Sequence, residues 1–173
     1  MNGFLLLIPF FLIRFGLLAS LSKDAIKRAA HFPQMKGNKI LAYWIYQISN
    51  IAIFVYLCFQ SVTIEFSWIF YIGLLLYIFG LILCVISIIN FANSSNEGLN
   101  SNGIYQLSRN PMYISYFIFF LACVFLTQSL ILFGITLVFQ ISTHWIILSE
   151  EKWCINKFGE SYRQYMKKVR RYI

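Results

Sequence analysis

Five long, apolar and almost uncharged stretches constrain the fold of this chain more than any other feature of its sequence. They run approximately from Phe4 to Leu21, Ile40 to Ser61, Phe66 to Phe91, Pro111 to Leu126 and Ser129 to Ser149. A helix needs about 20 mostly apolar residues to cross a bilayer. Only 12% of all residues are charged, whereas soluble domains carry about 25%. The sequence therefore predicts an all-α integral membrane protein with about five transmembrane helices.

The fourth and fifth stretches are separated by a very short connection. Thr127, Gln128 and Ser129 lie between them, and so short a link joins antiparallel neighbours. We therefore expect a C-terminal helical hairpin with its tip near Gln128. The whole chain, 1–173, reads as a single membrane domain, with three N-terminal helices in 1–91 and a loop, the hairpin and a tail in 92–173.

Positive charge gathers in two segments outside the apolar stretches. Segment 22–39 holds five basic residues and one acid, and the tail from Glu150 holds seven basic residues. Cytoplasmic loops of membrane proteins carry an excess of Lys and Arg, so we expect the N-terminus outside and the C-terminus in the cytoplasm. A net charge of +8 would suggest nucleic acid in a soluble protein. Here its distribution favours a membrane, with no nucleic-acid partner and no obligate protein partner. The small size and the Ile- and Phe-rich bias suit a bacterial inner membrane.

The four cysteines do not form a recognisable metal or disulfide motif. Cys58, Cys84, Cys123 and Cys154 lack CxxC spacing, and three of them lie inside apolar stretches. We interpret them as buried thiols that pack as small hydrophobes, and we predict no metal site.

The tail and the loop before the hairpin carry weaker patterns. In the tail, apolar residues recur at helical spacing, and Gly159 interrupts the pattern, which predicts two short amphipathic helices. Their basic face suits the anionic surface of a membrane. The loop 92–110 is rich in Asn, Ser and Gly, typical of a solvated connector. Alternatively, its less polar part, Gly103 to Tyr105, packs over something.

Arg109, Asn110 and Pro111 mark the start of the fourth apolar stretch. Asn is a good N-cap and Pro is favoured at the first helical position, so these residues could do no more than begin the helix. A helix N-terminus also attracts anions, and the planar guanidinium of Arg109 suits a carboxylate or phosphate. Tyr113, one turn on, can add a hydroxyl. The same residues are therefore candidates for binding.

Glu150 and Glu151 follow the fifth stretch, where we expect its helix to end. Carboxylates are unfavourable at a helix C-terminus, so a cation or hydroxyl groups should receive them. A simpler reading is that they stop the helix at the water boundary and pair with Lys152 or Arg163.

The hairpin brings these two clusters together. Counted from the tip at about 1.5 Å per residue, Glu150 lies roughly 7–8 Å closer to the cytoplasm than Pro111. Arg109, Tyr113, Glu150 and Glu151 can therefore surround one interfacial cavity that binds a zwitterionic molecule.

Two further polar residues within the apolar stretches are weaker site candidates. Intramembrane polar residues are often functional. His144 lies seven residues before Glu151, on a similar helix face, and Arg14 interrupts the first stretch. Packing would also explain His144, and snorkelling to the interface would explain Arg14.

At these residues the sequence resembles the superfamily of isoprenylcysteine carboxyl methyltransferases and phospholipid methyltransferases. The matching pieces are Gly103 to Tyr105, Ser108 to Tyr113, Glu150 with Glu151, and Phe158 to Tyr162 followed by Tyr165 and Val169 with Arg170. Each piece is short, but their order around a hairpin is fairly specific.

The resemblance implies a membrane enzyme that uses S-adenosylmethionine and methylates an amphiphilic acceptor, such as a prenylcysteine carboxylate, at the cytoplasmic face. It implies catalytic roles for Arg109 and Glu150. It implies cofactor binding by Tyr105, Arg109, Asn110, Pro111, Tyr113, Glu150 and Glu151, to which we add His144 from its position on the helix. The partners would be a lipophilic or prenylated acceptor and membrane lipid.

The sequence departs from the carboxyl methyltransferases at two positions. Those enzymes often have His where Asn110 stands and Gly where Ser115 stands. These departures weaken the transfer of prenylcysteine specificity, and the N-terminal helices carry no matching motif. A phospholipid-amine or thiol methyltransferase therefore remains an alternative. So do an NADPH-dependent membrane reductase with a similar hairpin and a non-catalytic membrane scaffold.

Overall fold

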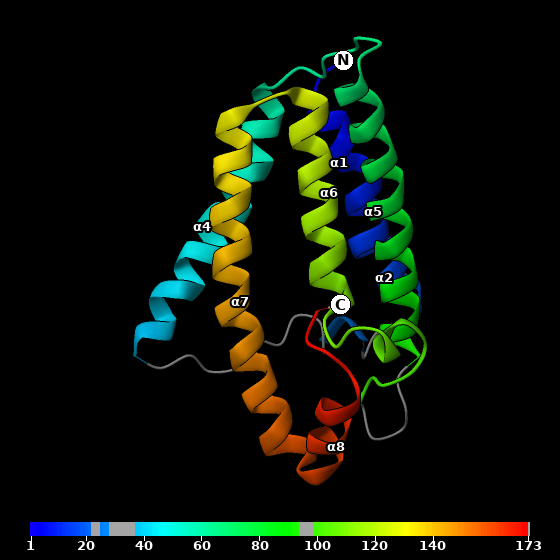
Figure 1. Ribbon diagram of the computed structural model, residues 1–173, viewed down its shortest axis with the longest axis vertical. Helices are drawn as coiled ribbons and strands as arrows, with labels where there is room; N and C mark the ends of the chain where they lie inside the picture. Colours follow the sequence, from blue (N-terminus) through cyan, green and yellow to red (C-terminus); the bar gives the residue numbers. More distant parts are fainter. Residues whose placement is uncertain (22–24, 28–36, 94–98, 173) are drawn as a thin grey trace.

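The computed structural model describes residues 1–21, 25–27, 37–93 and 99–172. Its helices are α1 Phe4–Phe11, the π-helical η1 Leu12–Leu17, α2 Leu18–Leu21, α4 Asn38–Phe59, α5 Trp68–Ala92, the 3₁₀ turn η2 Gly103–Gln106, α6 Pro111–Thr127, α7 Leu130–Phe158 and α8 Glu160–Lys168 (Figure 1). In these ranges the only β-type pairing is an isolated bridge between Asn2 and Ser61. Four spans are long and apolar enough to cross a membrane, and α6 is a shorter apolar helix. The predicted all-α membrane protein is confirmed.

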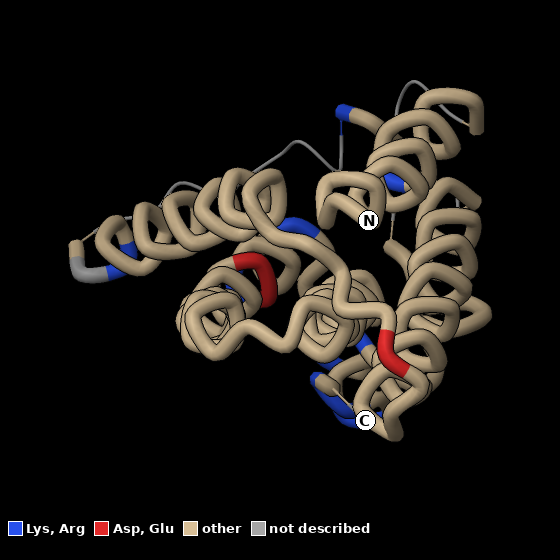
Figure 2. Tube along the Cα trace, turned by 90° about the horizontal axis from the view of Figure 1, so that it is seen from above, with Lys and Arg blue, Asp and Glu red and all other residues tan. Residues whose placement is uncertain are grey.

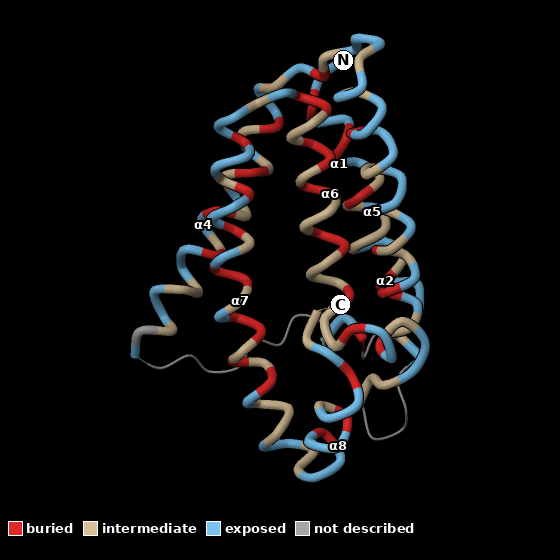
Figure 3. The backbone as a smooth tube through the Cα atoms, viewed as in Figure 1, coloured by how far each residue is buried: buried red, intermediate tan, exposed pale blue. Residues whose placement is uncertain are grey.

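Helix α6 lies at the centre of the bundle and has no exposed residue, whereas the other long helices have exposed faces (Figure 3) that carry many large apolar side chains. Its close approach to α5 depends on two small residues. A Cβ on Gly80 would lie 3.0 Å from the backbone nitrogen of Phe119, and a Cβ on Gly73 would lie 3.0 Å from Phe125 Cβ. Small residues let helix backbones approach where lipid supplies no hydrophobic drive. The outer faces remain apolar, as expected for helices that face lipid.

Aromatic side chains fill the centre of the bundle. The ring of Phe10 stacks on Phe119, with centroids 4.6 Å apart, and Phe120 meets Phe139 edge to face at 5.1 Å. These four residues are buried, and such ring pairs add stability beyond their buried area. They join the first span, α6 and α7 into one core.

The tip of the hairpin has the predicted position. Helix α6 ends at Thr127, Gln128 is left-handed with φ of 50°, and the Ser129 hydroxyl accepts a 3.3 Å hydrogen bond from the backbone nitrogen of Leu132. The tip lies near the N-terminus, because Val62 and Thr63 join the two: the backbone nitrogen of Val62 donates to the carbonyl of Met1, and that of Thr63 donates to the carbonyl of Leu126. The N-terminus and the hairpin tip are at the same end of Figure 1. The predicted hairpin is therefore confirmed.

The other end of α7 differs from the prediction. The helix does not stop near Ser149 but continues to Phe158, so Glu150 and Glu151 are internal helical residues. The predicted first tail helix is thus part of α7. The predicted break at Gly159 is correct, because this glycine has φ of +55° and α8 follows it. Helix α8, η2 and the C-terminus gather at the end opposite the N-terminus (Figure 1), and several Lys and Arg positions cluster beside the C-terminus in Figure 2.

The loop before α6 packs over this end rather than running free. Tyr105 is buried, and Gly103 has φ of +57° at a place where a Cβ would collide with the side chain of Asn90. The prediction that Gly103 to Tyr105 packs against other residues is therefore confirmed. Residues 94–98 lie outside the described part of the chain. Most of the predicted cytoplasmic segment 22–39 also lies outside them.

The cysteines are only partly as expected. Cys84 and Cys123 are buried and Cys154 is half-buried, but Cys58 is exposed on α4. Its thiol donates a 3.3 Å hydrogen bond to the carbonyl of Phe54 one turn before. An exposed position on an apolar helix faces lipid, where a thiol needs no burial in protein.

Candidate active site

A pocket of about 430 Å³ opens at the end of the bundle where the C-terminus lies. Seven parts of the chain line it: η1, Lys27, α4, the end of α5, the segment from Leu99 to the second turn of α6, the last third of α7, and α8. Residues far apart in sequence meet here because α7 runs past α6 and α8 folds back beneath it (Figure 1). This convergence makes the pocket the candidate active site.

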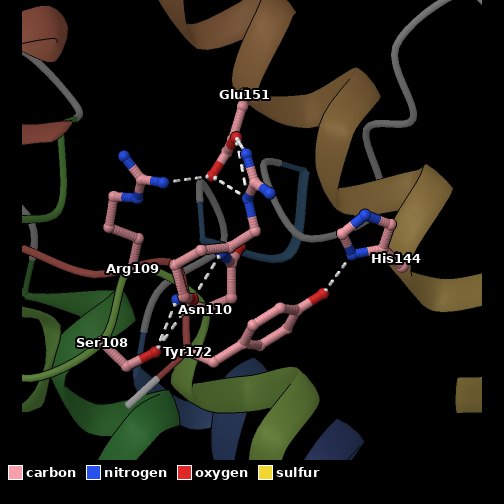
Figure 4. Close-up of polar contacts among 7 residues, drawn as sticks. Ser108, Arg109, Asn110, His144, Glu151 and Tyr172 are labelled. Atoms are coloured by element: carbon pink, nitrogen blue, oxygen red, sulfur yellow. Dashed lines mark hydrogen bonds and ion pairs between the residues drawn. The ribbon is translucent and has the colours of Figure 1, made fainter.

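Glu151 lies between two arginines in the wall of the pocket (Figure 4). Its Oε1 is 2.8 Å from Arg109 Nη2, and the Arg109 and Glu151 side chains are only 7% and 5% exposed. Arg171 adds a fork, with Nε donating to both carboxylate oxygens at 3.0 and 3.1 Å and Nη2 donating to Oε2 at 2.8 Å. Charge-assisted, bidentate contacts of this kind are strong. They allow a carboxylate to remain inside a helix near its end.

The carboxylate of Glu150 has different partners. The Tyr113 hydroxyl donates a 2.7 Å hydrogen bond to its Oε1, and Arg14 is close enough to interact with it electrostatically. The expectation that cations or hydroxyls receive the two carboxylates is thus correct. The simpler pairing with Lys152 or Arg163 is wrong, because in the described part of the chain Glu151 pairs with Arg109 and Arg171.

The residues 169–172, which we call the C-terminal strap, close one side of the site. The backbone nitrogen of Arg109 donates to the carbonyl of Arg170 at 3.0 Å. The carbonyl of Arg171 accepts from Ser108 Oγ at 3.2 Å and from Asn110 Nδ2 at 3.1 Å. The hydrogen bonds to Glu151 raise the pKa of the Arg171 guanidinium. The strap therefore holds the segment that leads into α6.

Asn110 is at the N-cap position, but its side chain does not cap the helix. The predicted cap is wrong because the amide is engaged with the strap instead. Pro111 does begin α6 as predicted. It is buried and does not line the pocket. Ser115, the other departure, is buried and donates a 2.7 Å hydrogen bond to the carbonyl of Met112, so the helix itself satisfies its hydroxyl.

His144 takes no part in the wall of the pocket. Its Nδ1 is 2.7 Å from the hydroxyl of Tyr172, and the two rings stack with centroids 6.2 Å apart (Figure 4). Of the residues predicted for the site, the pocket brings together Tyr105, Arg109, Asn110, Tyr113, Glu150 and Glu151. His144 instead contacts Tyr172 of the strap.

An aromatic wall from α7 and α8 was not expected from the sequence. Trp153, Phe158, Tyr162 and Tyr165 line the pocket, and the Tyr165 hydroxyl donates to the carbonyl of Tyr105. Burial raises the pKa of Tyr162 and of Tyr165, so both remain neutral phenols. Phe158, Tyr162 and Tyr165 have helical spacing in the sequence, but the tail was expected to lie on the membrane surface.

Two arginines have a larger part in the site than the sequence indicated, since Arg14 was only a weak candidate and Arg171 was not singled out. Arg14 comes from η1 and lines the pocket, although snorkelling was the simpler reading. An arginine inside an apolar stretch was the available signal. For Arg171 there was none, since it is one of several basic residues in the tail.

Three lining residues carry buried polar atoms without a hydrogen-bond partner in the described structure. They are Arg14 Nη1, Arg109 Nε and Asn100 Oδ1. Buried polar groups are nearly always paired, so these atoms point to a ligand with both an anionic or acceptor part and a donor part. The pocket thus offers free donors and a free acceptor beside its two carboxylates.

Comparison with known proteins agrees with this arrangement. Residues 68–161, more than half of the chain, match the family model described as phospholipid methyltransferase. No curated protein matches the chain. The matched range runs from α5 to the start of α8 and includes the first turn of α6 and both carboxylates of the site. The chain belongs to the phospholipid methyltransferase family, whose activity is methyl transfer in the membrane to lipid-like substrates.

Proposed function

We propose that this protein transfers the methyl group of S-adenosylmethionine to an amphiphilic acceptor that reaches the pocket from the bilayer. One observation carries the proposal: a single pocket holds Arg109, Glu150 and Glu151 together with the unpaired atoms Arg109 Nε and Asn100 Oδ1. A zwitterionic cofactor needs both an anion receptor and a cation receptor. The family match supports methyl transfer as the chemistry.

The residues present fit such a cofactor. The volume of about 430 Å³ lies within the range of small-molecule sites, roughly 300–1,000 Å³. Arg109 would hold the carboxylate of the cofactor through its free Nε, and Glu150 or Glu151 would hold its amino group or ribose hydroxyls. Tyr105 and the aromatic wall offer flat apolar surfaces for the purine base. Asn110 would shape this region through its bond to the strap.

When bound, S-adenosylmethionine supplies an electrophilic methyl group on a sulfonium. In-line transfer depends on an aligned, desolvated nucleophile more than on a strong acid or base. Burial of Tyr105, Tyr162 and Glu151 keeps water from this part of the pocket. The Tyr113 hydroxyl orients the Glu150 carboxylate toward the same space. A carboxylate or thiolate acceptor would then need no general base.

The first acceptor we propose is a prenylcysteine carboxylate. The second is the amine of a phospholipid, which the description of the matching family favours. An amine must be neutral before it attacks, so it either arrives neutral or loses a proton in the pocket. Glu150 would take that proton. Since residues of the basic tail line the pocket, we propose that the reaction takes place at the cytoplasmic face, with the N-terminus outside.

The cofactor assignment is tested by equilibrium binding of labelled S-adenosylmethionine to the purified protein in lipid nanodiscs. Glu150→Gln and Glu151→Gln should each weaken binding about tenfold or more, because charged hydrogen bonds contribute about 1.5–3 kcal/mol. Glu65→Gln, an exposed carboxylate on the α4–α5 loop, is the matched control and should change nothing. Unchanged affinity in both pocket variants would contradict the assignment.

The reaction is tested by methyl transfer from labelled cofactor to farnesylcysteine and to phosphatidylethanolamine in the same nanodiscs. Product with either acceptor supports the proposal and ranks the two. A thermal shift with NADPH but none with S-adenosylmethionine would replace it with a reductase. Failure to bind either molecule would leave a membrane scaffold.

A further inference from the structure

Arg14 is the one charged residue of the first span, Phe4–Leu21, and it borders the pocket. It belongs to η1, the π-helical segment between α1 and α2. π-helical turns are rare and occur frequently at functional sites. Here the turn interrupts an otherwise regular membrane helix at the residue that reaches the pocket.

The guanidinium of Arg14 is only partly satisfied. Its Cζ lies 5.4 Å from the centroid of the Tyr116 ring, a distance suited to a cation–π interaction. Its Nη1 is buried and has no hydrogen-bond partner in the described structure. An arginine keeps its charge in proteins, so the missing partner cannot be offset by loss of a proton. An anion in the pocket would supply it.

The anions already described do not fill this role. Glu151 is engaged by Arg109 and Arg171, and Glu150 accepts from Tyr113. Glu150 interacts electrostatically with Arg14, but it makes no ion pair with it in the described structure. Arg14 Nη1 therefore remains available to a ligand.

Arg14 also lies deeper in the bundle than Arg109 and Glu151, two of the residues proposed for the cofactor. Tyr116, which it faces, is five residues beyond Pro111, or about 7.5 Å along the axis of α6 from its start. Arg109 and Glu151 are held at that start by the strap. The pocket thus has an outer end with Arg109 and an inner end with Arg14. A polar cofactor enters from water, whereas a lipid-like acceptor enters from the bilayer, which is nearer the inner end.

We propose that Arg14 binds an oxyanion of the methyl acceptor, a carboxylate or a phosphate, and thereby selects anionic amphiphiles and orients them toward the cofactor. This inference rests on the proposed function, since it presumes that the outer end holds the cofactor. Arg14 then determines specificity for the acceptor. The planar fork of its guanidinium suits both oxyanions, and the acceptor's identity decides which one it meets.

The first experiment measures binding without catalysis. Dodecanoate, dodecyl phosphate and the neutral dodecanol are titrated into the full-length protein in nanodiscs, and binding is followed by isothermal calorimetry. The wild type should bind at least one anion about tenfold or more tightly than dodecanol, and Arg14→Gln should remove that preference. Preference for dodecanoate indicates a carboxylate acceptor, and preference for dodecyl phosphate indicates a phospholipid headgroup.

The second experiment measures transfer to farnesylcysteine and phosphatidylethanolamine at saturating cofactor. Arg14→Gln should raise the acceptor KM about tenfold to one hundredfold, with cofactor affinity within about twofold of the wild type. Arg14→Lys keeps the charge but loses the fork, so its acceptor KM should lie between the two. Arg163→Gln, an exposed cation on α8, is the matched control.

Three results overturn the inference: an anion preference that persists in Arg14→Gln, an unchanged acceptor KM, or a loss of cofactor affinity as large as that of Glu150→Gln. If Arg14→Gln does not fold, Arg14→Lys carries the test, and an acceptor KM equal to that of the wild type counts against the proposal. An anion preference that depends on Arg14, in a protein that does not bind S-adenosylmethionine, would support the anion site and refute the proposed function.

Discussion

Replacing Glu151 by Gln should destabilise the protein far more than replacing Arg171 or a carboxylate on the surface. Glu151 is 4% exposed and neutralises Arg109, whose side chain is 7% exposed. Without the carboxylate, the Arg109 guanidinium is left buried beside a second positive charge. Removal of one partner from a buried ion pair costs about 3–5 kcal/mol. For a chain of this size, that corresponds to a fall in Tm of roughly 6–20 °C.

The matched variant, Arg171→Gln, breaks the other half of the same cluster. The Arg171 side chain is 31% exposed, so water replaces part of what is lost, and Glu151 keeps its pair with Arg109. We expect a cost of about 1–2 kcal/mol, or roughly 2–8 °C. The double variant should be less destabilised than the sum of the two, because Gln at 151 has already removed the partner of Arg171.

The assay is thermal unfolding in one fixed detergent, followed by intrinsic tryptophan fluorescence, with Glu65→Gln as the control. The decisive comparison is the order of the three Tm values. If Arg171→Gln lowers Tm as much as Glu151→Gln does, burial does not set the cost of losing a charge here. Additive effects in the double variant would show that Glu151 and Arg171 do not act as one cluster.

Two other features of the structure give direct predictions. Gly80→Leu should lower Tm through overpacking that costs about 1–3 kcal/mol, because a side chain at this position meets the backbone of Phe119. Gly134→Leu should not lower Tm, because a Cβ there meets nothing within 4 Å. Equal losses of Tm in the two variants would contradict the close packing of α5 on α6. His144→Phe and Tyr172→Phe should each speed proteolytic removal of the strap to the same extent and without additivity, since both break the 2.7 Å bond between them. A further acceleration in the double variant would mean that His144 acts elsewhere.

The membrane spans and the hairpin could be predicted from the sequence, because they depend on local hydrophobicity and on a short connection. Turn residues at Gln128 and Ser129 need no tertiary information. The end of α7 could not be predicted, because distant residues rather than a local signal receive the Glu151 carboxylate within the helix. Those residues, Arg109 and Arg171, lie 42 positions before and 20 positions after Glu151 in the chain.

The residues of the candidate site also fall into those that the sequence could predict and those that it could not. Arg109, Tyr113, Glu150 and Glu151 could be brought together by counting along two antiparallel helices. Arg14 could not be counted in this way, since its side chain reaches the pocket from a π-helical turn, which no sequence pattern indicated. His144 was placed by helical spacing alone, and spacing does not reveal that Tyr172 stacks on its ring.

The strap also has a consequence for the order in which this protein matures on the ribosome. The membrane-spanning helices that the structure describes are all synthesised before Arg170 and Arg171, yet the carbonyls of these two residues hold Ser108, Arg109 and Asn110 in place. The nascent chain can therefore complete its insertion into the bilayer while the pocket is still open on one side. Folding of the site therefore follows insertion of these helices, and a sequence inserted close to the strap should interfere with it unless a flexible linker separates the two.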